Sequence, residues 1–276
     1  MRLQYGHELL DELRDIAVSA AREAAELAHA GRREGVSVAG TKSSASDVVT
    51  EMDRRSEALL VDRILSARPD DGLLGEEGAD HVGETGIRWV LDPIDGTVNY
   101  LYGNPSWAVS VAAEIDGVTV VGVVAAPALC ETYVAVQGRG AWLHDEHGTH
   151  RLRVNDPVDL PAALVATGFG YTVERRLAQA RVVQQVVPRV RDIRRGGACS
   201  IDLCFLAAGR LDGYYERGPH AWDLAAGGLI AQEAGARIEG LHGAPAGEEL
   251  IIAAGPHLFG ALHDLLAAAD AASDRA

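Results

Sequence analysis

Two aspartates, Asp92 and Asp95, stand three residues apart where the apolar run of residues 89–91 ends. The run favours a buried strand, and Pro93 is expected to end its ladder pairing and stiffen the turn. Two carboxylates on one stiff turn repel each other unless a cation lies between them. Mg²⁺ suits this role, because it takes oxygen ligands and is usually held by one or two carboxylates together with water and substrate phosphate.

Gly96 and Thr97 follow directly and could supply a second kind of chemistry. A glycine lets a ligand approach the backbone closely, and Thr97 is expected to cap a helix that begins here. The N–H groups of both residues would face outward at a helix start, which suits a phosphate. The alternative is a plain strand, an Asp-Pro turn and a helix cap, because the same residues are common turn formers.

The composition is that of an ordinary globular protein, with 276 residues, of which 47% are hydrophobic and 24% charged. This length allows one large domain or two small ones. The net charge of −15 argues against nucleic acid as a partner, because the phosphate backbone would be repelled. Three cysteines without a Cys-x-x-Cys pair favour a reducing cytoplasm. Residues 1–10 do not read as a signal peptide, and no apolar run reaches the roughly 18 residues of a membrane span.

The spacing of apolar residues predicts two successive styles of structure. Amphipathic helices are expected over residues 5–30 and after residues 47–53, and a short strand follows from residue 73. An antiparallel meander is expected over residues 108–114, 118–125, 131–136 and 141–143. From about residue 150 the chain is predicted to alternate between strands and helices. Strands are expected at 163–167, 192–195, 211–216 and 251–254. Helices are expected at 173–187, at 201–208, starting at 220, and at 256–269.

Four more acidic residues could reach a site, and each of them also has a plainer interpretation. Glu76 and Glu77 could simply end a solvated strand. Asp223 stands in the first turn of a predicted helix, where a carboxylate suits the macrodipole. Asp53 forms a capping box with Thr50.

Three other features stay open at this point. Lys42 is the sole lysine, within the polar loop 41–46, and either serves a site that needs a compact ammonium or is a surviving surface residue. Residues 144–151 contain three histidines, but their spacing fits no structural zinc pattern, which favours a hairpin loop. The small-residue turn 196–200 could present free N–H groups to a ligand or allow close helix packing.

Three motifs together resemble the inositol monophosphatase family of Mg²⁺-dependent, lithium-sensitive phosphatases. They are Gly-Glu-Glu at 75–77, Asp-Pro-Ile-Asp-Gly-Thr at 92–97 and Trp-Asp-Leu-Ala-Ala-Gly at 222–227. The resemblance runs over nearly the whole chain. It implies a layered α/β/α/β/α sandwich of mixed α+β and α/β character, a single domain with halves of about 1–150 and 151–276, and a homodimer.

The resemblance also implies a set of metal ligands and catalytic groups. Glu76, Asp92 and the carbonyl of Ile94 would hold one Mg²⁺, and Asp92 would bridge to a second one bound by Asp95 and Asp223. Two or three ions per subunit are expected, with Glu76 reaching the third and weaker one. Thr97 and Glu76 would orient the attacking water.

On the substrate side, the resemblance implies contacts from Gly96, Thr97, Asp95, Asp223, Gly197, Ala198, Cys199 and Glu216, with Lys42, Glu77 and Asp53 as accessory residues. The turn at 196–200 reads Gly-Gly-Ala-Cys-Ser where the family commonly has Gly-Ser/Thr-Ala-Ala. This departure alters the alcohol side of the pocket rather than the metal side.

Inositol 1-phosphate is the default substrate that the resemblance implies. Histidinol phosphate, fructose 1,6-bisphosphate and 3′-phosphoadenosine 5′-phosphate are the alternatives. Glu216 near the leaving group fits a hydroxyl-rich or cationic alcohol better than a second phosphate. A non-catalytic interaction module on the same fold is the hypothesis from another class, and it predicts that metal ligands have been lost.

Overall fold

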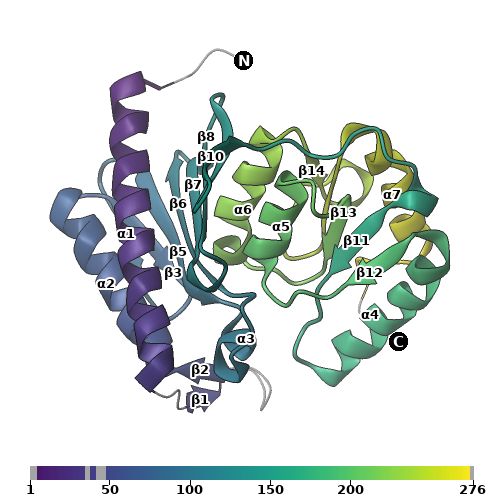
Figure 1. The fold of residues 1–276 in the computed structure, drawn as a ribbon, viewed down its shortest axis with the longest axis horizontal. Helices are drawn as coiled ribbons and strands as arrows, with labels where there is room; N and C mark the ends of the chain where they lie inside the picture. The colour runs from purple at the N-terminus through teal and green to yellow at the C-terminus, as the bar shows by residue number, and fades with distance from the viewer. Residues whose placement is uncertain (1–4, 35–37, 42–47, 274–276) are drawn as a thin grey trace.

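The computed structural model describes residues 5–34, 38–41 and 48–273, and these build five layers (Figure 1). Helices α1 (His7–Glu34) and α2 (Glu51–Ala67) cover one face of an eight-stranded sheet. Helices α5 (Cys199–Ala207) and α6 (Ala221–Glu233) lie between this sheet and a five-stranded one. Helices α4 (Val173–Val186) and α7 (Pro256–Ala268) cover the outer face of the smaller sheet. The expected α/β/α/β/α sandwich is therefore confirmed.

The larger sheet is a mostly antiparallel meander in the order β10-β9-β8-β7-β6-β5-β3-β4. Its strands are β3 (Gly72–Gly75), β4 (Asp80–His81), β5 (Ile87–Asp95), β6 (Ala108–Ile115), β7 (Val118–Ala126), β8 (Glu131–Val136), β9 (Gly140–Asp145) and β10 (Gly148–Arg151). The predicted meander is confirmed, and residues 144–151 form the expected hairpin. Among the described strands of this sheet, β3 and β5 are the only neighbours that pair in parallel, which brings the ends of these two strands to the same edge.

The smaller sheet has the order β12-β11-β13-β15-β14 and mixes parallel with antiparallel pairs. Its strands are β11 (Leu164–Thr167), β12 (Asp192–Arg194), β13 (Gly213–Glu216), β14 (Arg237–Glu239) and β15 (Ile251–Ala254). The edge strand β14 was not predicted, and neither was the short hairpin of β1 (Val38–Thr41) and β2 (Val48–Thr50). Lys42 lies outside the described residues.

Strand β5 corrects one sequence expectation. The strand was expected to end at Asp92, but it continues to Asp95 across a register shift, with Asp92 opposite Ser110 and Asp95 opposite Ala108 on β6. Pro93 falls in the interruption between these two pairs, where its missing N–H costs no ladder bond. The bulge sets both aspartates on a rigid strand rather than on a loop.

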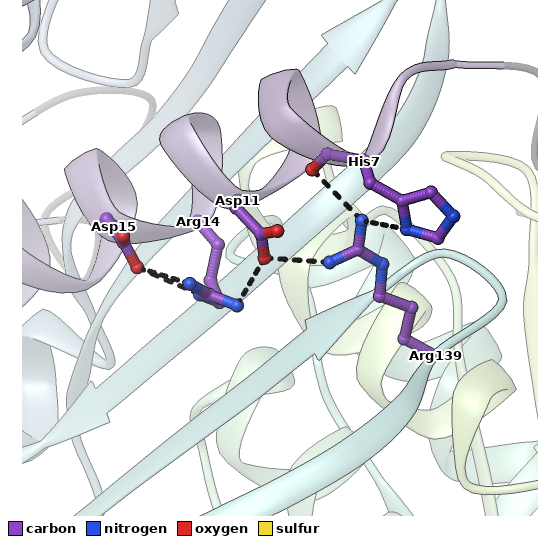
Figure 2. Close-up of polar contacts among 5 residues, drawn as sticks. All are labelled: His7, Asp11, Arg14, Asp15 and Arg139. Atoms are coloured by element: carbon purple, nitrogen blue, oxygen red, sulfur yellow. Dashed lines mark hydrogen bonds and ion pairs between the residues drawn. The ribbon is translucent and has the colours of Figure 1, made fainter.

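The N-terminal end of α1 is tied to the turn between β8 and β9 by the ionic network in Figure 2. Arg139 Nη1 lies 2.7 Å from Asp11 Oδ1, and Arg139 Nη2 donates to the His7 carbonyl over 3.1 Å. Arg14 pairs with Asp11 and Asp15. Exposed pairs of this kind contribute at most about 1 kcal/mol, so the apolar contacts of α1 with the sheet must hold this layer together.

No helix among the described residues combines the length and the apolar character that a bilayer crossing requires. Polar faces interrupt the longer helices, and the apolar ones are short.

Close packing of α6 on β7 generates the first prediction. A Cβ added at Gly122 of β7 would lie 2.7 Å from the Ala226 carbonyl oxygen and 3.0 Å from its Cα, both backbone atoms of α6. Gly122→Ala should therefore lower the free energy of unfolding by about 1–3 kcal/mol through overpacking, measured by urea denaturation.

Gly260→Ala is the matched control, because nothing lies within 4 Å of a Cβ at this position in α7. It should raise stability by about 0.5–1 kcal/mol. Equal effects of the two substitutions would contradict the close approach of α6 to β7.

Candidate active site

Three carboxylates from two distant segments of the chain lie close together. Asp92 and Asp95 lie on β5, and Asp223 lies in the first turn of α6. One oxygen from each lies within 4.8 Å of the other two, an arrangement that could hold a metal ion. The structure thus brings together three of the residues that the sequence proposes as ligands, although more than 120 residues separate Asp95 from Asp223.

Glu76 reaches the same place through the parallel pair of β3 and β5. Gly75 is opposite Leu91, and the Glu76 N–H donates to the Leu91 carbonyl over 3.2 Å. Glu76 is therefore beside Asp92. Its negative charge helps to raise the pKa values of Asp92 and Asp223.

In the described part of the chain these carboxylates lack directly paired cations, although the rise that burial causes in the pKa of Asp95 is partly offset by the charge of Arg195. Burial, and then mutual repulsion, raises the pKa of Asp92 and of Asp223 well above the ordinary value. Among the described residues, no ion pair involves Asp92, Asp95 or Asp223, and the buried Oδ2 of Asp92 has no hydrogen-bond partner. A hard divalent cation with oxygen ligands would supply both the missing charge and the missing partner, so the donor set fits Mg²⁺.

The bulge between Asp92 and Asp95 is held from two sides. The Ile94 N–H donates to Asp92 Oδ1 over 3.0 Å, and Ser56 of α2 donates to the Pro93 carbonyl over 3.2 Å. These bonds fix the side chain of Asp92 and the backbone that carries the Ile94 carbonyl.

Asp53 does more than cap α2. The predicted capping box with Thr50 is present, and the other carboxylate oxygen of Asp53, Oδ1, lies 3.1 Å from the hydroxyl of Thr97. The pKa of Asp53 is raised to about 6. Burial is the main cause of the raised pKa, and the negative charges of Glu77 and Glu76 add to it. The contact with Thr97 joins residues 44 apart, so the capping pattern alone could not reveal it.

The N-cap of the helix after β5 lies one residue earlier than predicted. Gly96, not Thr97, is the N-cap residue of α3 (Thr97–Tyr102), and it has a left-handed φ of 88°. A Cβ at Gly96 would lie 3.0 Å from the Ser106 carbonyl oxygen and 3.1 Å from Ala198 Cβ. Glycine is therefore required by both conformation and space, and it brings the predicted phosphate-binding residues against the predicted substrate turn.

The substrate turn is anchored to the β5 side by residues that sequence reasoning missed. Asn99 of α3 donates to the carbonyls of Ser106 and Gly196, over 2.6 and 2.9 Å. Asp202 is buried and accepts a hydrogen bond from the Gly196 backbone. A lone Asn and a helical Asp carry no sequence signal for this role, because it depends on elements that meet only in the fold.

Cys199 and Glu216 line the far side of the cluster. Burial raises the pKa of the Cys199 thiol well above its usual value, and the charges of Glu216, Asp223 and Asp95 add to the shift. A raised pKa disfavours the thiolate, which is the nucleophilic form of cysteine.

Glu216, at the end of β13, accepts a hydrogen bond from the Tyr214 hydroxyl. Gly168 leaves room for it, since a Cβ there would lie 2.0 Å from the Glu216 carboxyl carbon. Burial is the main cause that raises the pKa of Glu216 to about 7, and the charge of Asp95 contributes.

Glu77 stands at the edge of the site rather than among the clustered carboxylates. Its N–H donates to Glu57 Oε2 over 2.9 Å, and the Ala79 N–H donates to the other oxygen of Glu57 over 3.0 Å. Glu57, a buried residue of α2, thus holds in place the turn after β3, and this turn contains Glu76.

Comparison with known proteins agrees with this geometry. The model of the inositol monophosphatase family matches residues 9–273. The chain is 49% identical over 240 residues to the inositol-1-monophosphatase SuhB of Mycobacterium tuberculosis, covering 82% of this chain and 83% of the relative. It is 35% identical to a protein named Nus factor SuhB from Haemophilus influenzae, covering 83% and 85%.

Solved structures show the same fold. Mycobacterium tuberculosis SuhB superposes with a TM-score of 0.82 at 44% identity, over 95% of this chain and 98% of that one. An IMPase of Thermotoga maritima gives a TM-score of 0.83 at 28% identity, over 94% and 98%. The chain therefore belongs to the inositol monophosphatase family, a family of metal-dependent phosphoric monoester hydrolases.

Proposed function

We propose that this protein is a Mg²⁺-dependent phosphomonoesterase that hydrolyses a small polyol phosphate, with inositol 1-phosphate as the first candidate. The observation that carries the proposal is the cluster of Asp92, Asp95 and Asp223 beside Glu76, with an unpartnered buried oxygen on Asp92. Two or three ions per subunit would be held by these carboxylates and the Ile94 carbonyl. The single domain with two halves, the homodimer and the cytoplasmic location belong to the same proposal.

Hydrolysis of a phosphate monoester requires stabilisation of negative charge more than it requires a covalent intermediate. Phosphoryl transfer spreads negative charge over the phosphoryl oxygens, with the entering and leaving oxygens roughly in line. When bound, Mg²⁺ supplies positive charge to these oxygens and lowers the pKa of water. The backbone N–H groups of Gly96 and Thr97 would bind the phosphate from the other side.

Thr97 is the side chain best placed to orient the attacking water. Its hydroxyl lies 3.1 Å from Asp53 Oδ1 and 3.1 Å from the Ile94 carbonyl, and its single proton can go to only one of them. With the proton donated in either direction, the lone pairs of Oγ1 remain to accept a hydrogen bond from water. Water then attacks phosphorus, the bond to the alcohol oxygen breaks, and one proton of the water is transferred to that oxygen, so that the alcohol and inorganic phosphate leave.

The alcohol would lie against Glu216 and the turn of Gly197, Ala198 and Cys199. A partly buried acid that accepts one hydrogen bond from Tyr214 can accept further bonds from hydroxyl groups of a polyol. Relatives at 45–49% identity are named inositol-1-monophosphatase, which supports the same choice for this chain.

An interaction protein on the same fold is the alternative, and several relatives are named Nus factor SuhB. A chain that served only as an interaction module would not need the carboxylate cluster. Here all the proposed acidic ligands are present, and Asp92, Asp95 and Asp223 converge. The cluster favours catalysis.

A phosphate-release panel tests the function directly. Inositol 1-phosphate, histidinol phosphate, fructose 1,6-bisphosphate and 3′-phosphoadenosine 5′-phosphate are each compared at varied Mg²⁺, with and without Li⁺. We expect Mg²⁺-dependent, Li⁺-inhibited release that is fastest with inositol 1-phosphate. A faster rival would reassign the substrate, and no release at any Mg²⁺ concentration would favour the interaction module.

Asp95→Asn should lower kcat by about 100-fold or more, because it removes one negative ligand oxygen from the proposed second metal site. The fold should persist, since the amide has nearly the same shape. Asp264→Asn is the control, because this carboxylate is 83% exposed on α7. Unchanged turnover of Asp95→Asn, measured by phosphate release, would mean that the second metal site is misplaced.

Glu216→Gln should change how the stability of the metal-free protein depends on pH. The folded pKa of about 7 exceeds the ordinary value of 4.5, so the native state keeps its proton while the unfolded state loses it. This group therefore makes the wild type less stable as pH rises from 4.5 to 7. The neutral Gln retains an acceptor for Tyr214 and does not titrate.

Urea unfolding in EDTA measures this effect. The stability of Glu216→Gln relative to wild type should increase between pH 5 and pH 8. A difference that stays constant with pH would contradict the raised pKa of Glu216.

A further inference from the structure

The N-terminus of α5 is capped by a residue from the other side of the site. The N-cap residue of α5 is Ala198, which has no side-chain acceptor. Asp95 of β5 takes its place, since the Ser200 N–H donates to Asp95 Oδ2 over 2.7 Å. A backbone hydrogen bond from Cys199 reaches the same carboxylate. Asp95 is thus both a proposed metal ligand and the cap of the helix that carries the substrate turn.

Ser200 adds a side-chain hydrogen bond to this arrangement. Its hydroxyl donates to the same Oδ2 of Asp95 that accepts the Ser200 N–H. The side chain of Ser200 is fully buried, and its Cα would lie 3.1 Å from a Cβ at Gly227 of α6. Ser200 thus lies where α5 packs closely against α6, and its hydroxyl is shielded from bulk water.

This hydroxyl stands where the pattern Gly-Ser/Thr-Ala-Ala has none. Aligned on Gly197, the pattern places its hydroxyl at residue 198 and alanine at residue 200, whereas this chain has Ala198 and Ser200. The turn therefore has no hydroxyl at residue 198 and has one at residue 200, and the hydroxyl of Ser200 donates to a proposed metal ligand.

We propose that Ser200 is a positioning residue that holds the carboxylate of Asp95 in the orientation needed to bind a divalent cation, and so couples the metal site to the substrate turn. This inference rests on the proposed function, because it takes Asp95 as a ligand. Two bonds from one residue to one oxygen restrict rotation of the carboxylate, and a hydrogen bond to a charged acceptor is stronger than one between neutral groups. A carboxylate held in this way loses less freedom when a cation binds.

Ser200→Ala removes the hydroxyl and keeps the N–H. EDTA-stripped protein is titrated with Mn²⁺, and binding is followed by electron paramagnetic resonance. We expect the Mn²⁺ dissociation constant to rise by about 10-fold, the lower end of the range for groups that orient metal ligands. Ser200→Cys, with its weak S–H donor, should fall between Ser200→Ala and wild type.

Thr85→Ala is the matched control. Thr85 also donates its hydroxyl to a buried carboxylate, that of Asp71 over 2.6 Å, but Asp71 is not one of the proposed ligands. This variant should lose stability and keep the wild-type Mn²⁺ affinity. Melting curves in EDTA establish that each variant is folded before it is titrated.

The possible outcomes separate the two proposals. Wild-type Mn²⁺ affinity in both Ser200 variants, with Mg²⁺-dependent phosphate release intact, overturns the role of Ser200 and leaves the proposed function standing. If Ser200→Ala and Thr85→Ala weaken Mn²⁺ binding by the same factor, the effect is not specific to Ser200, and its proposed role is also overturned. A wild-type protein that neither binds Mn²⁺ nor releases phosphate overturns both.

Discussion

Repulsion between buried carboxylates is the constraint on which this structure depends. Asp92, Asp95 and Asp223 lie too close together to remain ionised without compensation, and Glu76 adds a fourth negative group. Either protons or cations must relieve the repulsion, so the two compete for the same oxygens. Proton uptake would neutralise the cluster at low pH, whereas divalent cations would do so near neutrality.

The rest of the fold keeps the acids from separating. Asp92 and Asp95 are fixed on a bulged central strand, Glu76 is beside them at the end of a parallel neighbour, and Asp223 starts a helix that packs closely on the same sheet. A flexible loop could relieve the repulsion by moving apart, but these elements are held by buried apolar layers on both faces of the sheet. The protein thus maintains a cluster of acids whose charge must be compensated by protons or by bound cations.

The site also joins the two sheets. Asp95 of β5 caps α5, which lies more than 100 residues further along the chain. Asn99, in the helix that follows β5, donates a hydrogen bond to the Gly196 carbonyl. Any change in the position of Asp95 is therefore transmitted to the turn that the alcohol would contact. In the proposed assignment, metal binding and substrate positioning share the carboxylate of Asp95, so a variant that disturbs one should disturb the other.

Much of this could be predicted from the sequence, because the three motifs carry both ligand chemistry and strand or helix signals. The family resemblance that the motifs carry implied the layers and the proximity of Asp92, Asp95 and Asp223, and the spacing of apolar residues predicted the meander. The bulge at Pro93 was not predicted, because a proline after a strand ordinarily ends it. The edge strands β4, β10 and β14 were missed because two to four residues give too little periodicity. The contacts of Asp53 with Thr97 and of Asp95 with Ser200 exist only once distant elements have packed.

A crystal structure of the Mn²⁺-soaked protein, with anomalous scattering recorded at the manganese edge, tests the central claim most directly. The account predicts at least two anomalous peaks within about 2.0–2.3 Å of carboxylate oxygens, one beside Asp92 and Glu76 and one shared by Asp92, Asp95 and Asp223. The orphaned Oδ2 of Asp92 should be among the ligands. An empty cluster at saturating Mn²⁺, or peaks confined to the exposed histidines of the β9–β10 hairpin, would contradict it.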